Sequence, residues 1–170
     1  MIEHWQNFFV MVGGGAAALT GLVFVALSLN LETIVKDLTH RNRAIGTLAG
    51  FTAIFVICAF GLIGDQHYQV FGLEWLIVSI FAGYIYVKGI VEVKKRGINL
   101  LTLGVNRIVV GTGLYVVEIL GALLFTLGSM LGLYIAAIAM IILLAYTITG
   151  AWLLVVGVCT EKTKVQTTKK

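Results

Sequence analysis

The chain has 170 residues, of which 59% are hydrophobic and only 12% are charged. Soluble globular proteins average about 45–50% apolar and about 25% charged residues. So few charges cannot cover a surface that faces water, which excludes an ordinary soluble domain and indicates that lipid surrounds most of the chain. The net charge of +4 does not indicate a nucleic-acid partner, because the basic residues lie in short segments between long apolar ones.

Five apolar segments are long enough to cross a bilayer as helices, which takes about 20 residues. They cover residues 8–31, 44–63, 71–90, 108–127 and 134–158. The last two belong to one stretch with a single acidic and no basic residue, long enough for two crossings, and we place the break between them at "LGSMLG". The sequence therefore predicts an all-α fold, a polytopic membrane helix bundle with five transmembrane helices.

We expect residues 1–160 to form a single transmembrane helical domain. Residues 161–170, "EKTKVQTTKK", are polar and basic, and we expect them to form a disordered cytoplasmic tail. The residues before the first apolar segment include the acidic Glu3 but no Lys or Arg. A cleaved secretory signal, in contrast, starts with basic residues. We therefore expect the first segment to be retained as a transmembrane helix.

The distribution of basic residues predicts how the bundle is oriented. With five spans, the segments 32–43, 91–107 and 159–170 lie on one side of the membrane. Together with Lys88, at the same end of the third span, they hold all 12 Lys and Arg residues. Cytoplasmic loops are enriched in Lys and Arg. We therefore expect a multi-pass protein of the inner (plasma) membrane, with its N-terminus outside and its C-terminus in the cytoplasm.

Two further features concern the membrane interfaces. Four aromatic residues fall near the predicted outer interface, where amphipathic rings are common: Trp5, Tyr68, Trp75 and Tyr134. On the inner side, the basic segment 94–96 would attract anionic lipid headgroups. The lipid bilayer and these headgroups are the partners that the sequence predicts most directly.

The first span contains the small-residue run "MVGGGAAALTG". Between membrane helices, close van der Waals contact replaces the hydrophobic effect, so small residues gather where helices pack. Two sets of small residues are spaced for this role: Gly14, Ala18, Gly21 and Ser28 on one stripe of the first span, and Gly46 with Gly50 in the second. We expect both to be helix-packing faces, against a helix of the same chain or of another copy. The alternative is that the three consecutive glycines form an unwound turn whose backbone binds an ion or a carboxylate.

Glu118 is the only charged residue in the stretch from residue 108 to residue 158, and it lies near the predicted bilayer midplane. An ionised carboxylate there costs at least about 2.5–3.5 kcal/mol, so we expect the group to be protonated, paired or in contact with water. Thr20, Ser79 and Tyr146 lie at a similar predicted depth and complete a candidate intramembrane polar site. Two interpretations stay open: a polar clamp between helices, or a proton or cation relay.

The sequence holds no motif for catalysis, for a cofactor or for a metal. It has no nucleophile elbow, P-loop, dinucleotide-binding glycine motif or zinc-ligand spacing. Cys58 and Cys159 are predicted at different membrane depths, which disfavours a disulfide. An intramembrane enzyme would need paired groups at one depth, so we expect no enzymatic activity, no cofactor and no bound metal.

The stretch "FFVMVGGGAAALTGLVFVALSLNL", followed by "HRNRAIGTLAGF", resembles small prokaryotic multi-span membrane proteins. In those proteins a glycine- and alanine-rich first helix leads into an "LTGLVFVALSLNL"-like string. Their function is unassigned, and the resemblance, which covers the first two spans, implies no functional residue in this chain.

Taken together, the surplus of small-residue faces favours a regulatory or scaffold-type membrane protein that acts through helix–helix contacts. Its partner would be a second copy of the chain or another membrane protein. The alternative is a small channel or an ion- or proton-coupled transport subunit that uses Glu118.

Overall fold

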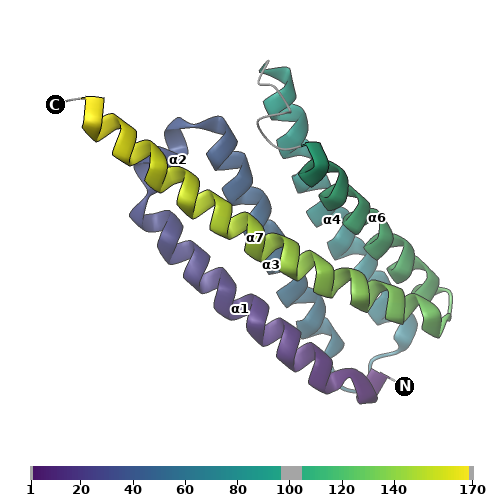
Figure 1. The fold of residues 1–170 in the computed structure, drawn as a ribbon. Coiled ribbons are helices and arrows are strands. Elements are labelled where there is room, and N and C mark those ends of the chain that lie inside the picture. Colours follow the sequence, from purple (N-terminus) through teal and green to yellow (C-terminus); the bar gives the residue numbers. More distant parts are fainter. Residues whose placement is uncertain (1, 97–104, 169–170) are drawn as a thin grey trace.

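The computed structural model describes residues 2–96 and 105–168, and within them the chain is an all-α bundle (Figure 1). In chain order the elements are the 3-10 helix η1 (Ile2–Trp5) and the α-helices α1 (Gln6–Leu29), α2 (Leu31–Lys36), α3 (Leu38–Gly61), α4 (Tyr68–Lys95), α6 (Val105–Thr126) and α7 (Met130–Thr168). Five of them, α1, α3, α4, α6 and α7, are long and apolar enough to cross a membrane. The predicted polytopic helix bundle with five spans is confirmed.

The five long helices all begin before the apolar segments from which they were predicted, and α4 and α7 also end after them. α3 begins at Leu38 instead of residue 44, because the side chain of Asp37 accepts a hydrogen bond from the backbone N–H of His40 (2.9 Å) and caps the helix there. α7 continues to Thr168, through residues for which the sequence predicts a disordered tail. The chain contains no proline to interrupt it. The start of α3 is thus set by its cap, whereas bilayer thickness concerns only the length of the apolar part of a helix.

A short extra helix replaces part of the loop expected between the first two spans. α2 follows directly on Asn30, whose side-chain amide donates to the backbone carbonyl of Ala26 (2.9 Å). Lys36 and Glu32 pair on its exposed surface at 2.6 Å. This segment is therefore helical and compact, and it packs against the start of α3.

Helices that follow one another in the sequence pack against one another in the bundle. α3 packs against α1 and α4, α4 packs against α6, and α6 packs against α7, which returns to contact α3 across the middle of the bundle. The N-terminus, the α3–α4 loop and the α6–α7 turn lie together at one end, whereas α2 and the C-terminus lie at the other (Figure 1). We call these the N-terminal end and the basic end.

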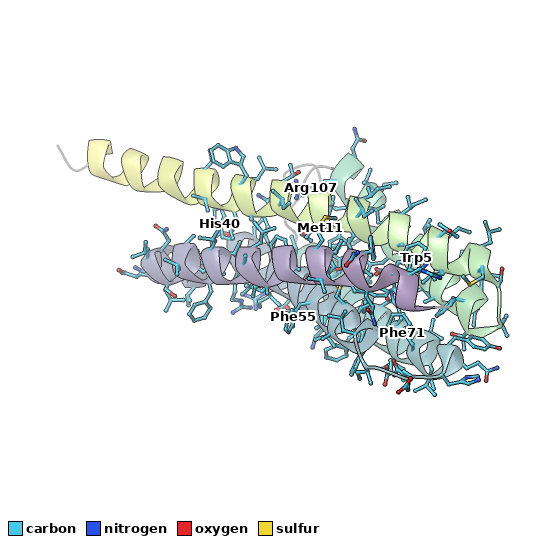
Figure 2. All side chains as sticks on the ribbon, turned by 90° about the horizontal axis from the view of Figure 1, so that it is seen from below. Trp5, Met11, His40, Phe55, Phe71 and Arg107 are labelled. Carbon is cyan, nitrogen blue, oxygen red and sulfur yellow. The ribbon has the colours of Figure 1, made fainter. Side chains whose placement is uncertain are left out.

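Side-chain contacts agree with this arrangement of the two ends. The ring of Trp5, just before α1, meets that of Tyr134, near the start of α7, with centroids 4.9 Å apart. Figure 2 shows Trp5 and Phe71 at the same end of the bundle and His40 toward the opposite end. The described Lys and Arg residues all lie toward the basic end, because they occur in α2, at the start of α3 and α6, and late in α4 and α7.

The core toward the N-terminal end is built from aromatic side chains and glycines. Phe9 of α1 and Phe71 of α4 are fully buried and meet edge to face, with centroids 5.4 Å apart. α6 and α7 approach closely at Gly121, where a β-carbon would lie 2.6 Å from the backbone nitrogen of Ala136. Small residues inside the bundle therefore bring helix backbones together, as expected of membrane helices.

Candidate functional site

Glu118 lies in the interior of the bundle, and its partner is a tryptophan. Its side chain is 1% exposed, and its Oε1 atom accepts a hydrogen bond from the Nε1–H of Trp75 on α4 (3.3 Å). Trp75 is fully buried. Its ring turns inward, onto Phe71 and toward α6, and is therefore not exposed as an aromatic residue of a lipid-facing interface would be. The pair links α4 to α6.

None of the partners that the sequence suggested for Glu118 makes a hydrogen bond with it among the described residues. The hydroxyl of Thr20 donates to the backbone carbonyl of Ala16 within its own helix (2.7 Å). Ser79 is fully buried on α4, one turn after Trp75, and its hydroxyl makes no hydrogen bond to a described residue. Depth alone could not identify the partner, since it does not say which way each helix is rotated.

Tyr146, the third suggested partner, belongs to a separate cluster toward the basic end. Its hydroxyl lies 2.8 Å from that of Tyr86 on α4, and both hydroxyls are within reach of the backbone carbonyl of Arg107 on α6, at 3.2 and 3.4 Å. Each hydroxyl carries one proton. One tyrosine therefore donates to the other, which donates to the carbonyl. Gly111 makes room, because a β-carbon there would lie 2.7 Å from the hydroxyl of Tyr146.

Arg107 is held on the same tyrosine by its side chain. An Nη2–H of its guanidinium donates to the backbone carbonyl of Tyr146 (3.2 Å), and the guanidinium carbon lies 4.7 Å from the centre of the tyrosine ring. This is cation–π geometry. Gly150 of α7 allows the approach, since a β-carbon there would lie 2.7 Å from Nη2 of Arg107 and 3.3 Å from the hydroxyl of Thr47 on α3. Arg107 thus reaches across α7 toward α3.

A pocket with a cavity volume of about 90 Å³ opens beside this cluster, between α3, α4, α6 and α7. Most of its lining residues carry a polar group, although much of the surface they present is apolar: Thr39, Asn42, Arg43, Thr47, Tyr86, Arg107, Tyr115, Tyr146 and Thr147 share it with three aliphatic residues and two glycines. Asn42 ties two walls together, because its amide donates to the carbonyl of Gly89 on α4 (3.4 Å). The space is large enough to hold several water molecules.

One face of α6 connects the pocket with Glu118. Arg107, Gly111, Tyr115 and Glu118 follow one another at helical spacing, and the last three are buried. Arg107 and Glu118 are therefore separated by about 16 Å along the helix at about 1.5 Å per residue. The ring of Tyr115 lies between them, 5.4 Å from that of Tyr86, and it is within electrostatic range of Glu118.

The small-residue stripe of α1 lies on the surface of the part of the bundle that the structure describes. Its members all lie on the exposed side of the helix: Gly14, Ala18, Gly21 and Ser28. A β-carbon at Gly14 or Gly21 would meet no atom within 4 Å. The residues that α1 buries lie on its opposite side, among them Phe9, Val12 and Ala16. If the stripe packs at all, it packs against another molecule.

The run of three glycines is part of a continuous helix, because α1 extends without a break from Gln6 to Leu29. The unwound turn considered above is thus not what the structure shows. Only Gly13 is tightly packed, since a β-carbon there would lie 2.7 Å from the β-carbon of Cys58 on α3. The neighbouring Gly14 and Gly15 face open space.

The glycine pair of the second span does form a packing face, but not against the first span. A β-carbon at Gly50 would lie 2.7 Å from the Cγ2 atom of Thr147 on α7 and 3.5 Å from the hydroxyl of Tyr115 on α6. Gly46 lies one turn away, lines the pocket and faces Tyr86. α3 therefore uses its small residues to approach the centre of the bundle.

The sequence did not place Trp75 and Arg107 among the residues of the candidate site. It assigned Trp75 to the outer interface and Arg107 to a basic loop. A signal for both was present in the sequence. Trp75 shares one helical face with Phe71 and Ser79, and Arg107 shares one with Gly111 and Glu118. Spacings of three and four residues along a helix would have placed these side chains on the same side as a polar or aromatic neighbour.

Comparisons with known proteins add no family to this description. No protein-family model, no curated protein and no solved structure matches the chain.

Proposed function

We propose that the protein is a scaffold-type integral membrane protein that associates with a second copy of itself through the exposed small-residue stripe of α1. The five apolar helices make it a multi-pass membrane protein. The finer proposal rests on one observation: the stripe lies diametrically opposite the buried side of α1, with open space above its glycines.

Small residues on the lipid-facing side of α1 support the proposal that another helix packs there. Lipid is as apolar as a leucine side chain, so helices attract each other in a membrane only where their surfaces fit closely. Gly14, Gly21 and Ser28 are spaced seven residues apart, which suits two helices crossing at about +20°. A second α1 of the same sequence would offer the same groove, so a two-fold symmetric dimer follows naturally.

Cysteine crosslinking in membranes tests this proposal. In a Cys159→Ser background, Gly14→Cys and Gly21→Cys should form disulfide-linked dimers on mild oxidation. Gly15→Cys is the matched control, because this glycine also faces open space but lies off the stripe. If the control crosslinks as well as the stripe positions, or if neither stripe position crosslinks, the proposed dimer is wrong.

Transport remains a second candidate, supported by the buried polar face of α6. Glu118, Tyr115 and the tyrosine pair at Arg107 form a succession of polar groups inside an apolar bundle. Such groups are expected where protons or ions move through a membrane protein. A carboxyl group and hydroxyl groups can each accept and donate a proton, which makes a proton relay the form of transport best supported.

Reconstituted liposomes separate this candidate from the scaffold. A relay predicts proton flux in the wild type that is lost in Glu118→Gln, since an amide cannot exchange the proton. Tyr84→Phe, which changes an exposed tyrosine of α4, should transport like the wild type. Equal flux in all three proteins, or none above empty liposomes, would remove this second candidate.

A further inference from the structure

The pocket between α3, α4, α6 and α7 is lined by two arginines and, among the described residues, by no acid. Arg43 lies on the first turns of α3 and Arg107 on the first turn of α6. Because both line the same small pocket, their like charges repel each other. Among the lining residues that the structure describes, none is acidic. The pocket therefore carries two positive charges without a carboxylate of its own.

The nearby acids are engaged elsewhere. Asp37 caps α3 through the N–H of His40 and lies 3.5 Å from the imidazole of the same residue. Glu92 lies 3.5 Å from Arg41 and 3.9 Å from Arg96. Among the described residues, no ion pair joins Arg43 to Asp37, whose carboxylate lies on His40. Holding two partly buried cations beside one pocket is unfavourable unless an anion joins them.

The donors that surround the pocket match an oxygen-rich anion. A guanidinium offers two parallel N–H groups that fit phosphate or carboxylate oxygens. Arg107 uses one N–H on the Tyr146 carbonyl, which orients its guanidinium and leaves further donors. The hydroxyls of Thr39 and Thr47 add neutral donors on the α3 side. Two arginines suit the double charge of a phosphate group better than the single charge of a carboxylate.

We propose that this pocket is a phosphate-binding site, in which Arg43 and Arg107 grip the phosphate oxygens from two sides. The site lies toward the basic end of the bundle, so the phosphate can belong to a lipid headgroup or to a soluble molecule. The chemistry that recognises it is the same in both cases. This site is separate from the α1 stripe, and it differs from the predicted attraction of headgroups to the exposed segment 94–96.

Binding of inorganic phosphate to the full chain tests the proposal for a soluble ligand. The protein is purified in neutral detergent, and equilibrium dialysis with radiolabelled phosphate measures the dissociation constant and stoichiometry. We expect saturable binding of one phosphate per chain. Removing a charged hydrogen-bond partner in Arg43→Gln or Arg107→Gln should weaken it by at least about tenfold.

A parallel measurement tests the lipid source. The same proteins are placed in nanodiscs of phosphatidylcholine, with or without phosphatidic acid, and their melting temperatures are compared. A headgroup ligand predicts that phosphatidic acid raises the melting temperature of the wild type but not of the two variants. Response to phosphatidic acid without binding of free phosphate would assign the site to a lipid headgroup, and binding of both would assign it to phosphate in general.

Lys36→Gln is the matched control, because it removes one positive charge from an exposed position of the basic end, 73% exposed at its side chain and outside the pocket lining. It should bind phosphate and respond to phosphatidic acid like the wild type. If Arg43→Gln fails to fold, Arg43→Lys keeps the charge without the two-pronged geometry and should still weaken binding. The proposal is overturned if the folded wild type binds neither probe, or if Lys36→Gln loses as much affinity as the pocket variants.

Discussion

Trp75 carries its indole N–H into the interior of the bundle, where it meets the carboxyl group of Glu118. In lipid or in an apolar core, each of these groups would otherwise lack a hydrogen-bond partner. The fully buried hydroxyl of Ser79, one turn farther along α4, shows that the interior holds further polarity. The acid that looked isolated in the sequence thus serves as a link between two helices.

At this scale we predict strong coupling between Trp75→Phe and Glu118→Leu. Each single variant leaves one buried group without its partner, whereas the double variant removes both. Their effects on the free energy of unfolding should therefore be less than additive, by between about 0.6 and about 1.7 kcal/mol, the mean and the maximum found for hydrogen bonds between membrane helices. Denaturation of the protein in mixed detergent micelles provides the measurement.

The control for this cycle is Leu120→Ala, which changes an exposed side chain of the same helix, 51% accessible. Combined with Trp75→Phe, it should give additive effects. Additivity in the Trp75–Glu118 pair as well would contradict a hydrogen bond of any energetic importance.

At the scale of one element, α1 shows how adjacent glycines differ in role. The helix buries Gly13 against Cys58 of α3, whereas Gly14, the next residue, faces outward. A helix turns by about 100° per residue, so neighbours in the sequence point in different directions. Three consecutive glycines indicate that α1 packs closely against another helix. The rotation of α1 about its axis decides which of the three glycines lies at that contact.

We expect Gly13→Ala to destabilise the protein and Gly14→Ala to leave the stability of a single chain nearly unchanged. The first variant places a methyl group 2.7 Å from the β-carbon of Cys58, and such overpacking costs about 1–3 kcal/mol. The second adds a methyl group where no atom lies within 4 Å. Unfolding in detergent at low protein concentration, where copies are separated, compares the two. Equal destabilisation would mean that α1 is rotated differently on α3.

For the whole molecule, the placement of the two ends has a consequence for topology. The N-terminal end holds the α3–α4 loop and the α6–α7 turn, and the described basic residues lie toward the opposite end. Five crossings require the two termini to lie on opposite sides of the membrane. Together with the enrichment of Lys and Arg on the cytoplasmic side, this predicts which end faces the cell interior.

Labelling of single cysteines checks that orientation. In a Cys159→Ser background, Ser129→Cys in the α6–α7 turn should react with a membrane-impermeant maleimide in intact cells. Arg96→Cys, at the other end of the bundle, should react only after the membrane is opened. The reverse pattern would mean that the bundle is inserted upside down, and labelling of both positions from outside would contradict five crossings.

The sequence by itself determined the number of long apolar helices, their approximate extent and the gathering of basic residues at one end. These features depend on the length of apolar segments and on the positions of charges, and both can be read directly from the linear sequence. Only the tertiary structure decided which side of each helix faces inward: the exposed stripe of Gly14, the buried indole of Trp75 and the inward turn of Arg107. In a soluble protein, hydrophobic periodicity would have marked the buried side. Here both lipid and core are apolar, so that signal is lost, and only the fit between helices determines their rotation.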